Sequence, residues 1–367
     1  MRTPLLVLAA ALAASPALAD KIYTADGKTI TDVDIVEEGL QKVIYKDGRN
    51  ERTVDSETVL QVEFDEMPRQ LGDAMTSLDE GDFESAALIF EDYVGGVLGG
   101  RDERRHKWAP AHAAWRVVEL KANLGDLAGA SEAAGLLIEN FPDSRYLPEA
   151  YMAKAEAAHL GKDVETAQAT LRDFQALIAN RGLSERWGIE CELALVTTDD
   201  DTRGPKRRSA LQKVADKAGK KFTAVRNSAL VAMGESYLYD LGASPEKADE
   251  YVPAAQELFE EVIADPRAKD ATLAGAYAGK GDCIFQVAAL TQDAVKLKEA
   301  LLAYLRVAAV YSEQSRYVPK SLFYAGRCFD LMEDDESKER AQLLYAQVWF
   351  LYPGTTWANE AKNFRKR

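Results

Sequence analysis

The chain shows two different spacings of hydrophobic residues, one after the other. Between residues 21 and 66, apolar positions alternate with polar ones or form short runs, which is typical of β-strands. Asp26-Gly27, Glu38-Gly39 and Asp47-Gly48 separate these runs, and Asp-Gly at such a place is a strong hairpin signal because glycine adopts positive φ. The pattern predicts about five short strands, at residues 21–23, 29–37, 42–46, 51–54 and 58–64.

Strands this short, so close together, predict a tiny barrel or a curled sheet. The pattern resembles the small SH3-like or Sm-like barrels that precede helical repeats in some exported bacterial proteins. That resemblance implies a docking or structural-cap role. The module holds no histidine or cysteine, and its acidic residues lie mostly in turns, which argues against catalysis there.

From Pro68 onward the spacing changes to the 3.6-residue period of amphipathic helices. On alternate helices a small residue is followed four positions later by a large apolar residue, as Ala86 is by Phe90, and often by a third at seven. The leading alanines recur every 37–46 residues, and a proline follows three of them after twelve residues. They are Ala86, Ala130, Ala167, Ala210, Ala254, Ala300 and Ala341, with the prolines at Pro142, Pro266 and Pro353.

The helices between them carry a mark of their own. Gly234, Gly281 and Gly326 are each followed three residues later by a larger side chain, and Ala155 occupies the same place in an earlier helix. A small residue there lets two helices approach closely. A fixed period of 20 to 50 residues is the signature of stacked repeats, whereas an ordinary helical bundle, the alternative, does not need the recurring proline.

Together these marks resemble the tetratricopeptide repeat (TPR) family, whose pattern has small residues at its eighth and twentieth positions and proline at its thirty-second. Segments 141–150 and 352–361 are similar to each other and resemble repeat junctions of bacterial envelope proteins. Every period here exceeds the family's 34 residues, so extra residues are expected in loops or longer helices. We predict a mainly α fold: an α-solenoid of about seven helical hairpins (TPR-like), preceded by a small β-barrel-like module and closed by a helix over 357–364.

The first twenty residues have the three parts of a secretory signal peptide. Arg2 supplies the positive start, residues 5–14 form an apolar run too short to span a bilayer, and Ala17-Leu18-Ala19 is a cleavage site before Asp20. We therefore predict a signal peptide (1–19), a β module (20–66) and a helical repeat domain (67–367). Without cysteine at residue 20 no lipid anchor is expected, and no other segment has the apolar length of a membrane span. The style of signal suits a bacterial periplasm, and full secretion stays open.

Composition narrows the function. The 45 Lys and Arg against 60 Asp and Glu leave a formal net charge of −15, which argues against a nucleic-acid binder because phosphate neutralisation needs clustered basic residues. Three cysteines exclude a disulfide-dense scaffold. The three histidines lack the spacing of helical metal ligands, and no hydrolase, P-loop or CxxC motif occurs. The sequence predicts a protein that is not an enzyme and has no cofactor or metal.

Two cysteines occupy the same place in consecutive repeats. Cys283 and Cys328 each lie two residues after the small residue, Gly281 or Gly326. Small residues there suit tight packing, which predicts buried free thiols. The alternative is a disulfide between Cys283 and Cys328 in an oxidising compartment, although neighbouring helices usually lie farther apart than a disulfide spans.

Charged clusters fall in predicted loops and at the end of the chain. Arg203, Lys206, Arg207 and Arg208 follow the acidic run 199–201, a second basic cluster lies within 101–107, and a third within 362–367. Solvated loops are the first interpretation. Contact with an acidic polymer or anionic headgroups at the cell envelope is the alternative.

An array of hairpins presents a surface formed by the first helix of each pair, and such a surface binds a peptide or another protein. On the geometry of the resembled family, the exposed partner-binding positions are Glu156, His159, Glu235, Tyr239, Asp282, Phe285 and Arg327. Acidic residues dominate, which favours a basic or mixed-charge partner. The leading prediction is a non-catalytic exported scaffold or adaptor that binds a protein or peptide partner in cell-envelope assembly.

Two other functions compete with this prediction. A peptidoglycan- or carbohydrate-associated binding protein would stack Trp and Tyr on sugars, but the five tryptophans mostly occupy helix-packing positions. A hydrolase would need acids converging on one face, such as Glu156, Glu235 and Asp282. These lie on different repeats, and we expect them to be too far apart for paired-carboxylate chemistry, which needs roughly 5–10 Å.

Overall fold

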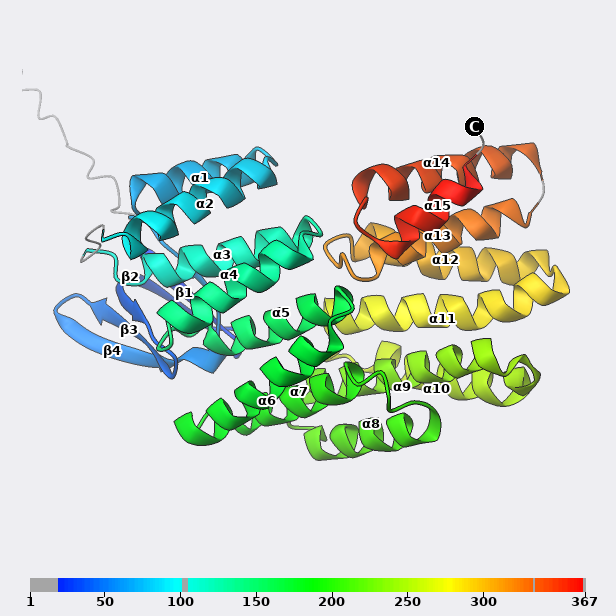
Figure 1. The fold of residues 1–367 in the computed structure, drawn as a ribbon, viewed down its shortest axis with the longest axis horizontal. Helices are drawn as coiled ribbons and strands as arrows, with labels where there is room; N and C mark the ends of the chain where they lie inside the picture. The colour runs from blue at the N-terminus through cyan, green and yellow to red at the C-terminus, as the bar shows by residue number, and fades with distance from the viewer. Residues whose placement is uncertain (1–18, 101–104, 333, 366–367) are drawn as a thin grey trace, which may run out of the picture. The chain divides into compact units, whose positions relative to one another are not determined.

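The computed structural model describes residues 19–100, 105–332 and 334–365 (Figure 1). The chain forms two compact units. The first unit is residues 1–113 with Phe141–Leu147, and the second is Ala114–Asn140 with residues 148–367. The predicted signal peptide lies outside the described residues up to position 18, as do parts of the first and third basic clusters. The predicted domain boundary at residue 66 stays a prediction.

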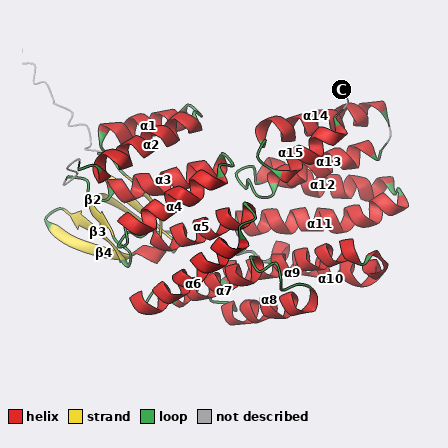
Figure 2. Cartoon of the chain, in the orientation of Figure 1, coloured by secondary structure: helices red, strands yellow, loops and turns green. Residues whose placement is uncertain are grey.

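Five antiparallel strands open the described chain, each where the sequence predicts one (Figure 2). They are β1 (Asp20–Thr24), β2 (Thr29–Glu38), β3 (Lys42–Asp47), β4 (Asn50–Asp55) and β5 (Val59–Glu63). The order across the sheet is β4-β3-β2-β1-β5, so β4 and β5 are its two edges. The sheet is therefore not closed into the predicted barrel, and the likeness to SH3-like or Sm-like barrels stays a prediction.

The sheet buries one of its faces. Ile22, Val33, Ile35, Val43 and Tyr45 are buried, and within a strand they are two residues apart, as successive positions on one face of a strand must be. The turns after β1 and β3 follow the expected chemistry, because the glycines at positions 27 and 48 have φ of 80° and 60°.

Fifteen α-helices follow within the described residues (Figures 1 and 2). They are α1 (Arg69–Asp79), α2 (Phe83–Leu98), α3 (Ala109–Asn123), α4 (Leu127–Asn140), α5 (Leu147–Leu160), α6 (Val164–Arg181), α7 (Glu185–Thr197), α8 (Gly204–Ala218), α9 (Thr223–Ala243), α10 (Ala248–Ala264), α11 (Asp270–Thr291), α12 (Ala294–Val310), α13 (Val318–Asp330), α14 (Asp335–Leu351) and α15 (Thr356–Phe364). Taken in pairs they make the seven predicted hairpins and the final short helix. None of the described helices is both long and apolar enough to cross a membrane.

The hairpins of the second unit stack in chain order. The first helix of one pair contacts the first helix of the next, as α7 contacts α9, α9 contacts α11 and α11 contacts α13. The first helices α7, α9, α11 and α13 also pack against their own second helices, α8, α10, α12 and α14, and α15 covers α13 and α14. This succession is the packing of a solenoid. The predicted fold class, a mainly α solenoid of helical hairpins after a small β module, is confirmed.

Close approach between helices occurs where the sequence predicts small residues. A Cβ atom added to Gly234 would lie 2.5 Å from the Phe259 ring, and one added to Gly281 would lie 2.7 Å from the ring of Tyr304. The same relation holds at Gly326, where the distance to the Tyr345 ring would be 2.6 Å. Each ring comes from a second helix and fills the space that the missing side chain leaves.

The register of the second helices agrees with the sequence at five of seven leading alanines, and α8 and α10 are the exceptions. Ala210 and Ala254 are only partly buried. The buried positions lie one residue later, at Leu211 and Ala255. A shift of one residue turns a helical side chain by 100°, so a pattern of small and large residues alone locates the buried stripe only to within a neighbouring position.

The disulfide that was the alternative for Cys283 and Cys328 is absent. Cys283 and Cys328 are free thiols, buried in different hydrophobic clusters, and Cys191 is also free and buried. Burial raises the pKa of Cys283 and of Cys328 to about 12. They are therefore protonated packing residues at neutral pH, as the first interpretation of this pair states.

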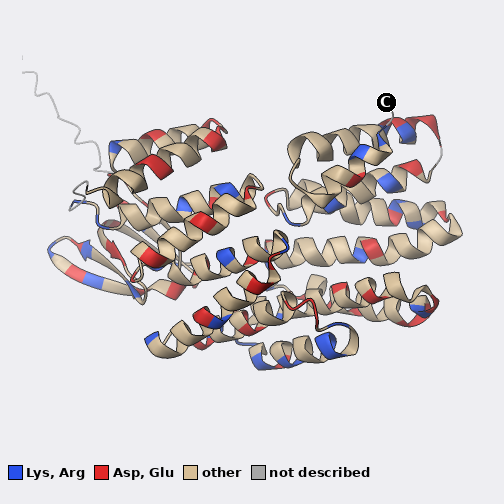
Figure 3. Cartoon of the chain, viewed as in Figure 1, with Lys and Arg blue, Asp and Glu red and all other residues tan. Residues whose placement is uncertain are grey.

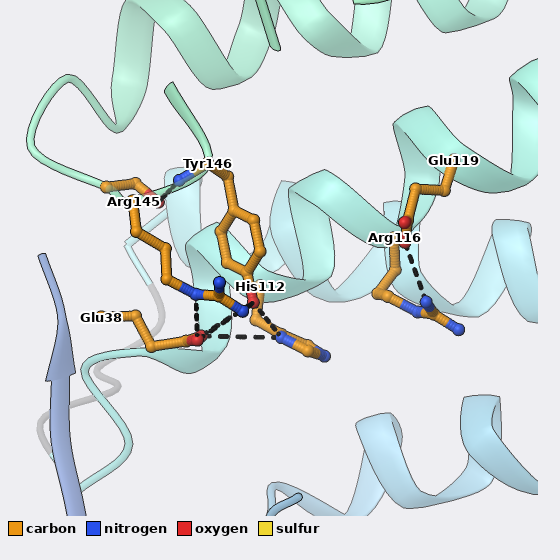
Figure 4. A network of polar contacts seen from close by, with 7 residues as sticks. Glu38, His112, Arg116, Glu119, Arg145 and Tyr146 are labelled. Atoms are coloured by element: carbon orange, nitrogen blue, oxygen red, sulfur yellow. Dashed lines mark hydrogen bonds and ion pairs between the residues drawn. The ribbon is translucent and has the colours of Figure 1, made fainter. Parts of the chain in front are cut away.

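An ion pair is buried inside the first unit (Figure 4). Glu38 lies at the end of β2, and Arg145 and Tyr146 lie in the loop Phe141–Leu147. The Arg145 Nε donates a hydrogen bond to Glu38 Oε1 at 2.5 Å, and its Nη2 donates to the Tyr146 hydroxyl at 2.9 Å. That hydroxyl donates in turn to the Glu38 carboxylate at 3.1 Å. The side chains of Glu38 and Arg145 are 1% and 11% exposed.

Backbone contacts and a histidine complete this junction. The Arg145 N–H donates to the Glu38 carbonyl at 3.0 Å, and an isolated antiparallel bridge joins Gly39 to Ser144. His112 Nδ1 lies 2.8 Å from the Tyr146 hydroxyl. Burial alone would raise the pKa of the Glu38 carboxyl, but Arg145 and His112 hold that pKa below its usual value. Glu38 is therefore a charged, fully paired anion that joins the loop to the sheet.

Candidate functional site

The second unit contains a pocket of about 770 Å³, within the usual range for ligand-binding cavities. Its walls come from α5, α7 and α9, from the first turns of α8 and α11, and from the loop at 311–317 between α12 and α13. We call it the first-helix pocket, because α5, α7 and α9 are the first helices of successive hairpins. Its charged and larger polar lining residues are Glu156, His159, Glu190, Asp200, Arg203, Arg207, Glu235, Tyr239, Asp240, Gln314, Arg316 and Tyr317.

Arg316 lies between two carboxylates in this pocket. Its Nη1 is 3.7 Å from Glu156 Oε1 on α5, and its Nη2 is 4.0 Å from Glu235 Oε2 on α9. The side chains of Arg316, Glu156 and Glu235 are 58%, 56% and 33% exposed. Both distances exceed those of hydrogen bonds, and water screens both contacts. The Arg316 guanidinium therefore lies between the two carboxylates without a hydrogen bond to either of them.

The backbone beside Arg316 is held more firmly than its side chain. Tyr317 packs on Gly275 of α11, where an added Cβ atom would lie 2.9 Å from the tyrosine ring. The Tyr317 N–H donates to the Gln314 carbonyl at 2.9 Å, which closes the turn before α13. Burial raises the pKa of the Tyr317 hydroxyl, so this ring is neutral. The loop has a defined path, and the Arg316 side chain is its adaptable part.

Two further arginines line the pocket at the start of α8. Arg207 donates to the carbonyl of Thr197 at 2.6 Å and to that of Asp199 at 3.4 Å. Arg203 hydrogen-bonds the Tyr239 hydroxyl, and its guanidinium carbon is 5.1 Å from the centre of that ring. The acidic run 199–201 lies in the loop just before them (Figure 3). The pocket thus presents both signs of charge.

The prediction of a solvated position is wrong for Arg208 of this basic cluster, whereas Lys206 is exposed. Residues 204–218 form α8, and Arg208 is buried within it. Arg208 forms an ion pair with Asp240 of α9, and its guanidinium carbon lies 4.1 Å above the Tyr237 ring. This arginine belongs to the packing between α8 and α9.

Two titratable groups in the pocket lack ordinary solvation. The Nδ1 atom of His159 is buried and forms no hydrogen bond within the described part of the chain. Burial raises the pKa of the Glu190 carboxyl, and Arg186, which lies 3.4 Å away, offsets part of that rise. Buried polar atoms without partners are costly, so the His159 nitrogen marks a place where a ligand or water would supply a hydrogen bond.

The structure brings together four of the seven residues that the sequence predicts for partner binding. Glu156, His159, Glu235 and Tyr239 line the first-helix pocket. Glu156 and Glu235 also meet at one guanidinium. The expectation that these acids lie too far apart for paired-carboxylate chemistry stays a prediction, and a shared arginine does not give them the geometry of a hydrolytic acid and base.

Asp282, Phe285 and Arg327 lie elsewhere, and the predicted exposure of the first two is wrong. Asp282 is buried, accepts a hydrogen bond from the Tyr304 hydroxyl at 2.8 Å and forms an ion pair with Lys320. Phe285 is buried in the cluster around α11 to α15. Arg327 is partly buried, with its guanidinium carbon 4.4 Å above the Phe364 ring of α15. All three hold neighbouring helices together.

Sequence reasoning missed Arg316 and Tyr317. A signal for them exists, because the chain has the segment Ser-Arg-Tyr-Leu-Pro at 144–148 and Ser-Arg-Tyr-Val-Pro at 315–319. Both segments join a second helix to the next first helix. A recurring arginine and tyrosine at the same junction is a sequence mark of a repeated local structure. Its partners, however, come from elements distant in the chain.

The pocket has few of the features expected of a carbohydrate-binding or metal-binding site. No tryptophan lines it, so the aromatic platform expected of a carbohydrate site rests on Tyr239 and Tyr317 alone among the described lining residues. Within the described ranges, no group of three or more His, Cys, Asp and Glu side chains is arranged to hold a metal ion.

Comparison with known proteins adds a distant structural likeness. No family model matches the chain, and no curated protein matches it. Among solved structures, the chain is similar to a Rap protein complexed with Competence and Sporulation Factor. The TM-score is 0.39 and the identity 14%, over 81% of this chain and 94% of that chain. A likeness of this size indicates no shared function or ligand.

Proposed function

We propose that this protein is a non-catalytic scaffold or adaptor that binds a protein or peptide segment in the first-helix pocket. The observation that carries this proposal is the pocket itself, because successive first helices line it with acidic and basic side chains. A peptide chain offers both charge signs and hydrogen-bonding backbone groups, and so complements such a mixed wall better than a purely apolar or purely anionic molecule does.

The unpaired nitrogen of His159 supports the same proposal. A backbone N–H or carbonyl of a bound segment would satisfy it, with the donor and acceptor roles set by the histidine tautomer. Tyr239 is exposed in the pocket although Arg203 contacts its ring, and the uncovered part of the ring offers a surface against which an apolar side chain packs. Binding along this wall would use hydrogen bonds for affinity and charge for specificity.

The role we propose is outside the cytoplasm, with the periplasm as the first expectation. The signal-peptide pattern supports export, and β1 begins at Asp20, directly after the expected cleavage site. The Asp20 carboxylate accepts backbone hydrogen bonds from Ile35 at 2.7 Å and Asp65 at 2.8 Å. Cleavage after Ala19 would leave this residue, and the strand that follows it, intact.

Site-specific photocrosslinking in cells tests the binding function. A photoreactive phenylalanine replaces Tyr239 in the pocket or, as a control, Phe350 on α14, which is similarly exposed but does not line the pocket. We expect a discrete crosslinked partner from position 239 only. Equal crosslinking from both positions, or none from 239 and from other pocket positions, would contradict the proposal.

Export has a test of its own. Amino-terminal sequencing of the protein from fractionated cells is expected to find a chain that begins at Asp20 in the periplasmic or secreted fraction. An uncleaved amino terminus retained with the cytoplasmic fraction would refute export and leave the binding function untouched.

A further inference from the structure

The acidic pair in the first-helix pocket already holds a guanidinium, and that guanidinium belongs to the chain itself. Arg316 approaches Glu156 and Glu235 from the loop at 311–317, while the two acids come from α5 and α9. Among the described residues, no other basic side chain forms an ion pair with either acid within 4.0 Å. The site is thus shaped for one cation between two carboxylates.

The contacts that hold Arg316 are weak ones. No hydrogen bond joins its guanidinium to Glu156 or Glu235, since the separations are 3.7 and 4.0 Å, and more than half of the side chain is exposed. Exposed ion pairs at such distances contribute little to stability. The equivalent arginine of the other Ser-Arg-Tyr segment, Arg145, is buried and hydrogen-bonded to Glu38 at 2.5 Å. Arg316 is by comparison a displaceable occupant.

We propose that Arg316 is an internal stand-in for a basic side chain of the partner, and that the partner's arginine or lysine displaces it from Glu156 and Glu235. This inference rests on the proposed function of the pocket. The lining has five acidic residues and three arginines, one of which is Arg316 itself, but Glu190 is paired with Arg186 and Asp240 with Arg208, which do not line the pocket. When Arg316 withdraws, the three remaining acids, Glu156, Asp200 and Glu235, face two arginines, so one cation from the partner restores the balance and the charge of the lining favours a basic ligand.

The loop has the means to release Arg316 without unfolding. Tyr317 remains packed on Gly275, and the turn from Gln314 remains closed, while the arginine side chain rotates toward solvent. Binding then costs two screened ion pairs and the contact of the guanidinium with the Tyr317 ring, whose centre lies 5.4 Å from the guanidinium carbon. The partner gains the same two carboxylates, with water excluded by the rest of the bound segment, where such pairs are stronger.

A small guanidinium probe tests the site without any knowledge of the partner. Calorimetric titration with N-acetyl-arginine methylamide compares wild type, Arg316→Ala and the control Arg340→Ala, which removes an exposed arginine of α14 that does not line the pocket. We expect Arg316→Ala to bind the probe about fivefold more tightly than wild type does, the ratio that corresponds to removing about 1 kcal/mol of competing ion pairs. Arg340→Ala should match wild type, and adding Glu156→Gln and Glu235→Gln to Arg316→Ala should abolish the gain.

The uncharged analogue N-acetyl-citrulline methylamide separates charge from shape. We expect this analogue to bind each variant no more tightly than it binds wild type. Equal affinity of wild type and Arg316→Ala for the arginine probe would overturn the stand-in role. So would a gain of the citrulline analogue in Arg316→Ala as large as the gain of the arginine probe. Circular dichroism of each variant checks that it is folded, which the exposure of these side chains leads us to expect.

Peptides selected from a random displayed library against wild type provide the second arm. We expect selected peptides to be rich in Arg and Lys, to bind Arg316→Ala more tightly than wild type, and to bind Glu156→Gln/Glu235→Gln less tightly. Acid-rich peptides that lose affinity in Arg316→Ala would show that Arg316 binds the partner directly, as Arg145 binds Glu38, and would overturn the proposal. If Arg316→Ala binds the arginine probe more tightly but no selected peptide depends on the pocket residues, the peptide-binding function alone is refuted.

Discussion

The two Ser-Arg-Tyr segments of this chain occupy the same kind of junction and meet opposite surroundings. In the first unit, Arg145 faces Glu38, which the end of β2 inserts beside the loop, and both side chains are buried. In the second unit, Arg316 faces Glu156 and Glu235 across an open pocket, with all three side chains in contact with water. The same local sequence thus forms a buried, hydrogen-bonded ion pair at Arg145 and an exposed ion pair without hydrogen bonds at Arg316.

The difference follows from desolvation. A buried arginine without its partner would be an uncompensated charge, so the first junction is stable only when the carboxylate, the tyrosine hydroxyl and the backbone bonds are all in place. An exposed arginine loses little when its partner leaves, because water replaces the contact. The closed junction is therefore sensitive to the loss of either partner, and the open junction is available for binding.

Removal of the buried carboxylate should have the largest effect on stability. We expect Glu38→Ala to lower the free energy of unfolding by about 3–5 kcal/mol, since it leaves Arg145 charged and unpaired in the interior. The control is Glu119→Ala, which removes a partly exposed partner of Arg116 on α3 (Figure 4) and should cost less than about 1 kcal/mol.

Urea denaturation of both variants measures this difference, and hydrogen exchange of peptides covering residues 29–47 locates it. A loss in Glu38→Ala no larger than in Glu119→Ala would mean that the junction is not a structural lock. Faster exchange confined to other parts of the chain would mean the same.

The same substitution at Arg145 and at Arg316 should affect stability differently. Lysine keeps the charge but lacks the planar fork, so Arg145→Lys cannot keep both its bond to Glu38 and its bond to the Tyr146 hydroxyl. We expect Arg145→Lys to cost about 1–3 kcal/mol and Arg316→Lys to stay within about 0.5 kcal/mol of wild type. Thermal and urea unfolding of the two variants provide the numbers, and equal losses would argue that the two junctions are alike.

Acidification should produce the smallest and most gradual effect. Arg145 and His112 hold the pKa of Glu38 below the value of 4.5 that we take for the unfolded chain. A carboxyl whose pKa is lowered by folding adds stability above its unfolded pKa and loses it as the pH falls through the folded pKa. The difference in unfolding free energy between wild type and Glu38→Gln is therefore expected to shrink below pH 4.5. A difference that stays constant from neutral pH to about pH 3 would contradict the ionised state of Glu38.

Much of the fold could be predicted because its causes are local. Asp-Gly turns and alternating apolar residues located the five strands, and the recurring small residues located the helix pairs, as at Gly281, where the ring of Tyr304 takes the vacant space. The closure of the barrel could not be predicted, since it depends on whether two edge strands meet. The burial of Asp282 and Phe285 was also missed, because neighbouring positions on a helix point in directions 100° apart.

The candidate site was only partly within reach of the sequence. Glu156, His159, Glu235 and Tyr239 follow from the repeat pattern, since the same positions of successive first helices share one wall. Arg316 does not follow from it, because the loop that bears this residue lies 160 positions from Glu156 in the chain. Such a pairing is decided by how far the stacked hairpins turn, and each turn is set by side chains packed between helices.

The type and order of the elements in the described residues follow from the sequence: five strands, seven helical hairpins and a final helix, with small residues where helices touch. Those properties depend on backbone preferences and on the spacing of apolar residues over a few turns of chain. Only the tertiary structure decided which of two identical Ser-Arg-Tyr segments is buried and which lines a pocket. The physical reason is that burial and charge pairing depend on what distant elements bring alongside, and neither segment contains that information.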